Sequence, residues 1–127
     1  MNMREILFRG KRINSGEWAY GDLLTCDDEM EIYSESHGEN GGWVIPGTVG
    51  EYTGLTDKNG VKIFEGDIIR RKRIDGNWYS YEVFWWENCW GIKGGAEVAL
   101  MILPLCGLQV IGNIHDNPEL LGGDTNA

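Results

Sequence analysis

The sequence predicts an all-β fold, mainly strands with one or two short helices. Nineteen of the 127 residues are glycine, and they separate short runs of aromatic and β-branched side chains, as turns separate strands. No long window places apolar residues at helical spacing. The length suits a single domain over residues 1–127, able to bury a core without a metal or a disulfide framework.

The N-terminal region predicts a hairpin and a short strand. Period-two alternation over residues 4–12 indicates a strand, a turn follows at 14–16, and residues 17–24 indicate the returning strand. Residues 43–46 form an apolar run that ends in Pro46, a pattern typical of an edge strand.

The segment 48–69, TVGEYTGLTDKNGVKIFEGDII, holds the strongest turn signal. Asn59-Gly60 fits a type I′ turn with least strain, because both central residues of that turn need positive φ. Apolar residues flank the pair, and a second turn signal follows at 65–67. We therefore expect strand, tight turn, strand, turn, strand.

The following region predicts a second hairpin, from Ile68–Ile74 and Asn77–Glu87. A two-residue loop at Asp75-Gly76 sets the register. The expected cross-strand pairs are Arg73 with Trp78, Lys72 with Tyr79, Arg71 with Ser80, Arg70 with Tyr81 and Ile68 with Val83.

Two short helices are expected towards the C-terminus. Residues 96–103 have the length of two helical turns, and Pro104 ends them. Asn117 followed by Pro118 is a start signal for a short helix.

Charge is distributed unevenly along the chain. The formal net charge is -9, and residues 21–57 hold nine acids with no Lys or Arg. This balance does not favour nucleic acid or an anionic membrane as a partner. We expect an acidic loop excursion at about 25–42, with a short strand at 30–33. Its carboxylates lack EF-hand spacing, so no metal site is predicted.

Cysteine usage and hydropathy indicate a cytoplasmic protein. Cys26, Cys89 and Cys106 are odd in number and widely spaced, which fits neither a disulfide framework nor a zinc site and suits a reducing compartment. The N-terminus lacks the apolar run of a signal peptide. The longest apolar run, 98–106, is too short to span a bilayer.

Basic and aromatic residues gather on the predicted second hairpin. The candidate binding residues are Arg70, Arg71, Lys72, Arg73, Trp78, Tyr79 and Tyr81. Cations beside stacking platforms suit single-stranded nucleic acid. Strand residues alternate between faces, however, so only two of the four charges can lie together. Pairing of these charges with the acidic segment is the preferred interpretation.

The strand that ends this hairpin is apolar on both faces. Tyr79, Tyr81, Val83 and Trp85 share one face, whereas Trp78, Phe84 and Trp86 share the other. Either another layer of the same chain or a second copy has to cover them. Because aromatics are enriched at interface cores, we expect a homo-oligomer, with candidate interface residues Phe84, Trp85, Trp86 and Trp90.

No catalytic residue is predicted. The two histidines, His37 and His115, lie in a loop and beside a helix start. The sequence holds no phosphate-binding glycine loop, nucleophile elbow or zinc-protease motif.

Three segments resemble the YopX family of uncharacterised phage and prophage proteins. They are REILFRGKRINSGEWAYGDLL at 4–24, VIPGTVGEYTGLTDKNGVKIFEGDII at 44–69 and QVIGNIHDNPELL at 109–121. The acidic excursion and residues 71–108 do not show the likeness clearly. The resemblance implies a mainly β, YopX-like domain with an SH3-like barrel element and a phage or prophage origin. It implies no reaction and no catalytic residues.

We therefore predict a non-catalytic accessory protein that binds host or phage macromolecules in the bacterial cytoplasm. Two alternatives are a single-stranded nucleic-acid-binding SH3-like module and an acidic mimic that occupies a nucleic-acid site on a host protein. A hydrolytic enzyme is less favoured. No cofactor is predicted, and the expected partners are a second copy and a host or phage protein rather than a membrane.

Overall fold

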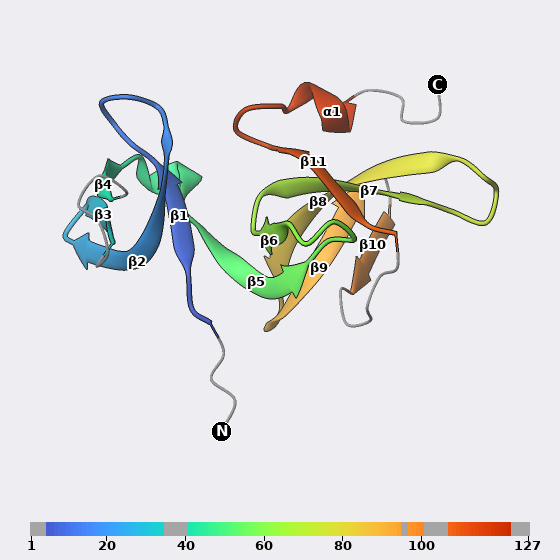
Figure 1. Cartoon of the computed structure of the whole chain (residues 1–127), viewed down its shortest axis with the longest axis horizontal. Helices are drawn as coiled ribbons and strands as arrows, with labels where there is room; N and C mark the ends of the chain where they lie inside the picture. The colour runs from blue at the N-terminus through green and yellow to red at the C-terminus, as the bar shows by residue number, and fades with distance from the viewer. Residues whose placement is uncertain (1–4, 35–40, 95–96, 101–106, 123–127) are drawn as a thin grey trace. The chain divides into compact units, whose positions relative to one another are not determined.

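The computed structural model describes residues 5–34, 41–94, 97–100 and 107–122, and they are nearly all β (Figure 1). The strands are β1 (Phe8–Lys11), β2 (Trp18–Cys26), β3 (Glu29–Tyr33), β4 (Gly42–Val44), β5 (Gly50–Thr56), β6 (Lys62–Phe64), β7 (Asp67–Lys72), β8 (Trp78–Trp86), β9 (Cys89–Gly94), β10 (Glu97–Leu100) and β11 (Gln109–Asn113). A 3₁₀ turn, η2 (Pro46–Thr48), and a short helix, α1 (Glu119–Gly122), complete the described elements. The prediction of a mainly β fold is confirmed, whereas the SH3-like barrel stays a prediction.

The chain divides into two compact units, Met1–Gly54 and Leu55–Ala127. The expectation of a single domain therefore stays a prediction. The chain passes from one unit to the other within β5, after Gly54.

In the first unit the antiparallel strands follow the order β4-β3-β2-β1-β5, and β4 also bonds back to the end of β1. The Ile13 N–H donates to the Trp43 carbonyl at 3.0 Å, and the Ile45 N–H donates to the Lys11 carbonyl at 2.8 Å. The strands thus enclose a small core of Ala19, Ile32 and Val44. In Figure 1 they are the blue to green elements.

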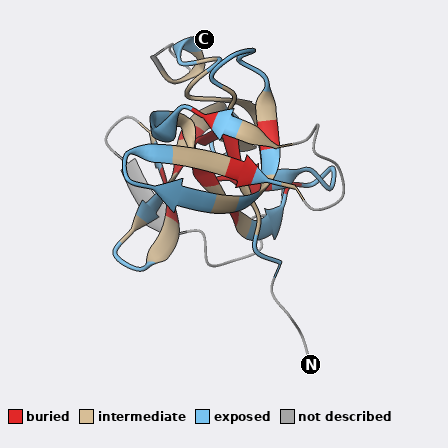
Figure 2. Cartoon of the chain, turned by 90° about the vertical axis from the view of Figure 1, so that its left-hand side faces the viewer, coloured by how far each residue is buried: buried red, intermediate tan, exposed pale blue. Residues whose placement is uncertain are grey.

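In the second unit an antiparallel sheet has the order β10-β9-β8-β7-β11. One face carries the core, which consists of Ile63, Ile69, Tyr81, Val83, Ile92 and Leu108. Cross-strand pairing sets Ile69 opposite Tyr81 and Val83 opposite Ile92, so these side chains share that face. Figure 2, which is coloured by burial, shows the buried residues of the chain as short parts of strands.

The turn at Asn59-Gly60 is not the expected type I′ turn. Of its two central residues only Gly60 has positive φ, at 83°. The Asp57 N–H donates to the Val61 carbonyl at 2.8 Å, and the Gly60 N–H donates to the Asp57 carbonyl at 3.0 Å. This pattern closes a three-residue loop with a left-handed final residue. The expected order of strands and turns is confirmed by β5, β6 and β7.

The β7–β8 register differs by one residue from the expected one. Lys72 pairs with Trp78 and Arg71 with Tyr79. The Arg73 N–H donates to the Asn77 carbonyl at 2.9 Å, so the loop holds three residues instead of two. It ends in Gly76, whose φ is +86°. The loop is of the same type as that at Gly60. Because it is one residue longer than expected, every observed pair differs by one residue from the predicted pair.

Of the two helices expected towards the C-terminus, one is wrong and one is confirmed. Glu97–Leu100 form strand β10 and pair with β9, because the exposed edge of β9 offers a ladder partner that short helical propensity cannot outweigh. Residues 101–106 lie outside the described part of the chain. The short helix after Pro118 is present as α1. The strand expected at 30–33 is also present, as β3.

Candidate functional site

The β7–β8 hairpin distributes the predicted binding residues between two faces of its sheet. The cross-strand pairs put Arg70, Lys72 and Trp78 on one face and Arg71, Arg73, Tyr79 and Tyr81 on the other. The seven residues therefore form two separate groups, as expected from the alternation of faces.

The first group centres on Trp78. The Arg70 guanidinium lies 4.6 Å from the Trp78 ring centroid, and the Lys58 Nζ lies 5.9 Å from the same centroid. Arg70 is oriented further by donating from Nε to Gln109 Oε1 at 3.1 Å. Two cations beside one half-buried indole can hold an anionic or π-rich ligand.

The second group is built into the sheet. The Arg73 guanidinium lies 5.1 Å from the Tyr79 ring, and that of Arg71 lies 5.6 Å from the Tyr81 ring. The Tyr79 hydroxyl donates to Asp75 Oδ2 at 2.5 Å. This hydrogen bond lowers the pKa of Asp75 and raises that of Tyr79. Tyr81 is buried in the core, so its ring face is not available for stacking.

The aromatic tract proposed as an oligomer interface forms two pairs. Trp85 contacts Trp90 edge to face, with centroids 4.8 Å apart and an angle of 75°. On the opposite face Phe84 stacks with Trp86 at 6.1 Å, and Lys93 Nζ lies 4.5 Å from the Phe84 ring. Trp85 is still 50% exposed. The interface stays a prediction, with Trp85 as its most exposed member.

Asp57 is a buried carboxylate with a structural use. Its Oδ1 accepts the N–H groups of Asn59 and Val61 at 2.8 and 2.9 Å, and its Oδ2 accepts that of Val110 at 2.9 Å. Burial raises the pKa of Asp57, but these three donors, with Val110 the strongest, lower the pKa below its ordinary value. Asp57 thus joins the turn after β5 to β11.

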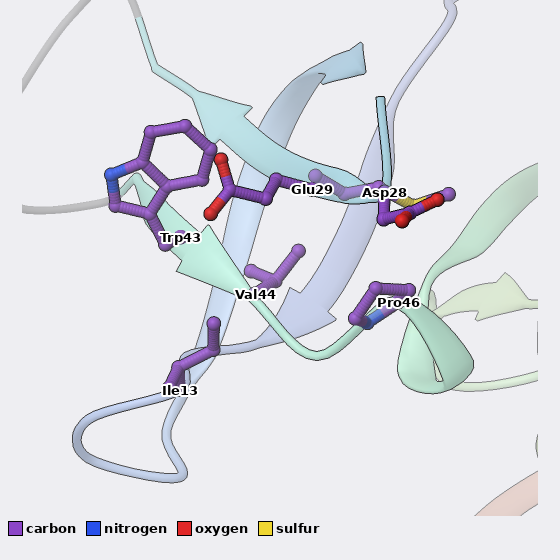
Figure 3. Close-up of a pocket in the computed structure, with 7 residues that line it drawn as sticks. Ile13, Asp28, Glu29, Trp43, Val44 and Pro46 are labelled. Atoms are coloured by element: carbon purple, nitrogen blue, oxygen red, sulfur yellow. The ribbon is translucent and has the colours of Figure 1, made fainter. Parts of the chain in front are cut away.

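A pocket in the first unit, which the sequence did not reveal, is lined by Ile13, Asp28, Glu29, Met30, Trp43, Val44 and Pro46 (Figure 3). Its volume is about 180 Å³. The two-residue turn between β2 and β3 carries Asp28, and strand β4 carries Trp43. In Figure 3 the Glu29 carboxylate extends towards the Trp43 ring. The only feature of the sequence that pointed to this region was the lack of basic residues from 21 to 57.

Groups suited to catalysis do not converge within the described residues. There, no cluster of three or more His, Cys, Asp or Glu could hold a metal ion. Cys26 and Cys89 form no disulfide, and Cys106 and His37 lie outside the described residues. The His115 N–H donates to Asn113 Oδ1 at the start of the turn before α1. No helix of the described chain is long and apolar enough to cross a membrane.

The fold and these surfaces define a small, nearly all-β protein with aromatic and charged surfaces on antiparallel sheets. The chain belongs to the YopX family, described as "YopX protein", which matches residues 1–122. It is similar to the crystal structure of protein EF1440 from Enterococcus faecalis, with 26% sequence identity and a TM-score of 0.61. That likeness covers 94% of this chain and 99% of the other. No curated protein matches the sequence.

Proposed function

We propose that this protein is a non-catalytic accessory protein of phage or prophage origin that binds another protein in the bacterial cytoplasm. Membership of the YopX family supports the origin. The partner is a host or phage protein, and no cofactor takes part.

The observation that carries this proposal is the outward face of β2, β3 and β4. The register pairs Leu24 with Glu31 and Glu31 with Trp43 in one row across the three strands, and Asp22 with Tyr33 beside it. Leu24, Tyr33 and Trp43 are each about half exposed, at 51%, 49% and 50%. Large apolar side chains gathered on one face of a sheet are typical of a protein interaction surface.

The carboxylates with displaced pKa values support a non-catalytic role. The pKa values of Asp57 and Asp75 are both lowered, and both side chains accept hydrogen bonds from the backbone of their own turns. A general acid at neutral pH needs a raised carboxyl pKa instead. Both groups are therefore ionised at neutral pH and do not have the raised pKa of a general acid.

A second candidate function is binding of single-stranded nucleic acid by the Trp78 group. The observation in its favour is the pair of cations, Arg70 and Lys58, beside an indole that is not fully buried. The net charge of -9 opposes it, since a polyanion is repelled at long range. An acidic mimic is a special case of the protein-binding proposal, in which the outward face of β2–β4 meets a basic site on a host protein.

The experiment is a pull-down from bacterial host lysate with the tagged protein, repeated after nuclease treatment. We expect a discrete protein partner in both samples. Recovery of nucleic acid, with every partner lost after nuclease treatment, would favour the second candidate. No partner in either sample, together with turnover in a broad screen of hydrolase substrates, would contradict both.

A further inference from the structure

The pocket of the first unit has walls and a rim of different chemistry. Its floor is the buried Val44 with the half-buried Met30, and its walls are Ile13, Trp43 and Pro46, all exposed. The carboxylates of Asp28 and Glu29 lie at the edge (Figure 3). An apolar cleft beside carboxylates and an indole suits a long apolar stem that ends in a cation.

We propose that this pocket receives a lysine or arginine side chain from the partner protein. The inference rests on the proposed function, because it names the chemistry by which the partner is recognised. The methylene stem of the basic side chain packs on Ile13 and Pro46. Its charged end lies beside the Trp43 ring and pairs with Glu29, while Asp28 adds negative charge at the Pro46 side of the pocket (Figure 3).

The local charge favours an incoming cation. No Lys or Arg occurs between residues 21 and 57. Within the described chain, no hydrogen bond or ion pair engages the carboxylates of Asp28 and Glu29, so their charges are not compensated. The basic side chain next to Ile13 is engaged elsewhere: Arg12 Nε donates to the Gly41 carbonyl at 2.8 Å, and Arg12 Nη1 lies 3.6 Å from Glu17.

The surroundings favour a protein as the source of that cation. Trp43 belongs both to the pocket and to the exposed row with Glu31 and Leu24, so a chain anchored in the pocket can continue across the β2–β4 face. A nucleic-acid backbone would meet the carboxylates with like charge. A second copy of this chain also carries a net charge of -9, so long-range repulsion opposes self-association at this face.

The test follows the Trp43 indole N–H signal by ¹H–¹⁵N NMR while short blocked peptides are added. The probes are acetylated and amidated Gly-Arg-Gly and Gly-Lys-Gly, and the control peptide carries citrulline, which keeps the shape of arginine without its charge. Trp43→Phe assigns the signal. We expect saturable shifts with both basic peptides and binding at least about fivefold weaker with the citrulline peptide.

Substitutions then distinguish the effect of the carboxylates at the pocket edge from the effect of the overall charge of the protein. Glu29→Gln should weaken the arginine peptide about two- to fivefold, and Asp28→Asn with Glu29→Gln about tenfold, because exposed ion pairs each contribute little. Glu87→Gln is the matched control, since it removes one exposed carboxylate charge outside both the pocket and the β2–β4 face, in the second unit, and should leave binding unchanged. Raising the salt concentration should weaken the basic peptides only.

Equal binding of the citrulline peptide, equal effects of Glu87→Gln and Glu29→Gln, or no saturation would overturn the inference. Shifts of the Trp43 signal that grow with protein concentration in the absence of peptide would show that a second copy of the chain, not a basic side chain, occupies the pocket. A pull-down partner that still binds the Asp28→Asn, Glu29→Gln variant would leave the proposed function intact and refute this pocket. Absence of any partner, with peptide binding as expected, would refute the proposed function alone.

Discussion

Replacing Asp57 by asparagine tests whether one carboxylate holds the second unit together. Asp57 is 7% exposed and accepts three backbone N–H groups, from Asn59, Val61 and Val110. An amide has a single acceptor oxygen. If it keeps the two donors of the turn, its NH₂ group faces the Val110 N–H, and one buried donor loses its partner.

The magnitude follows from these contacts. A buried donor without a partner costs about 1–3 kcal/mol, and hydrogen bonds to a charged acceptor are roughly twice as strong as those to a neutral one. We therefore expect Asp57→Asn to lower the free energy of unfolding by about 2–4 kcal/mol. With a urea m-value of about 2 kcal/mol/M, the midpoint should fall by roughly 1–2 M.

The assay is urea unfolding followed by tryptophan fluorescence, because Trp78, Trp85, Trp86 and Trp90 all lie in the second unit. Asp75→Asn is the matched control. Asp75 also accepts a backbone N–H, that of Asn77 at 2.8 Å, but it is exposed. Water can replace its partners, so the midpoint should hardly change.

The pH dependence of the stability difference tests whether Asp57 acts as a charged carboxylate. Since the pKa of Asp57 is lowered on folding, its contribution is fully present above the unfolded value of about 3.9 and is lost as the pH falls through the folded pKa. The difference between wild type and Asp57→Asn should therefore shrink below about pH 4. A difference that is absent at pH 7, or that grows on acidification, would refute the role given to this carboxylate.

Three further changes have defined outcomes. Glu87 and Asn88 both have positive φ, at 48° and 72°. Glu87→Asn with Asn88→Gly should therefore raise the free energy of unfolding by about 0.5–1 kcal/mol in urea titrations. A lower free energy of unfolding would mean that the Glu87 side chain has an unrecognised contact. A Cβ on Gly10 would lie 3.0 Å from the Val44 side chain, so Gly10→Ala should cost about 1–3 kcal/mol, whereas Gly47→Ala, with open space around it, should be nearly neutral. If Trp85 takes part in self-association, light scattering behind a sizing column should give more than a monomer mass at micromolar concentration, and Trp85→Glu should reduce it; a monomer mass for both proteins would exclude the predicted interface.

Turn chemistry made most strands predictable from the sequence. Glycine and asparagine marked where strands stop, and alternation marked which residues share a face. Tyr81 and Val83 are buried together in the core, as expected from their spacing in the sequence. Loop length was not predictable, because Asp75-Gly76 suits both a two-residue and a three-residue loop. The hydrogen bond from the Arg73 N–H to the Asn77 carbonyl closes the three-residue loop.

Other features depend on partners that are distant in the sequence. Asp57 accepts a hydrogen bond from Val110, 53 residues away, and no local sequence pattern predicts that contact. Glu97–Leu100 became a strand because β9 offered an edge. The pocket brings Ile13 beside Trp43 through the bonding of β4 back to the end of β1. Composition showed the acidic character of this region but not the apolar cleft within it.

The proposed function requires that the first unit binds a protein through its acidic and aromatic face. The most direct measurement is calorimetric titration of the partner recovered after nuclease treatment against wild type, Trp43→Ser and Arg70→Gln. Because buried tryptophans dominate protein interfaces, Trp43→Ser should weaken binding about tenfold or more, while Arg70→Gln should leave it within about twofold. Loss of binding with Arg70→Gln and full binding with Trp43→Ser would contradict the claim and assign the contact to the Trp78 group.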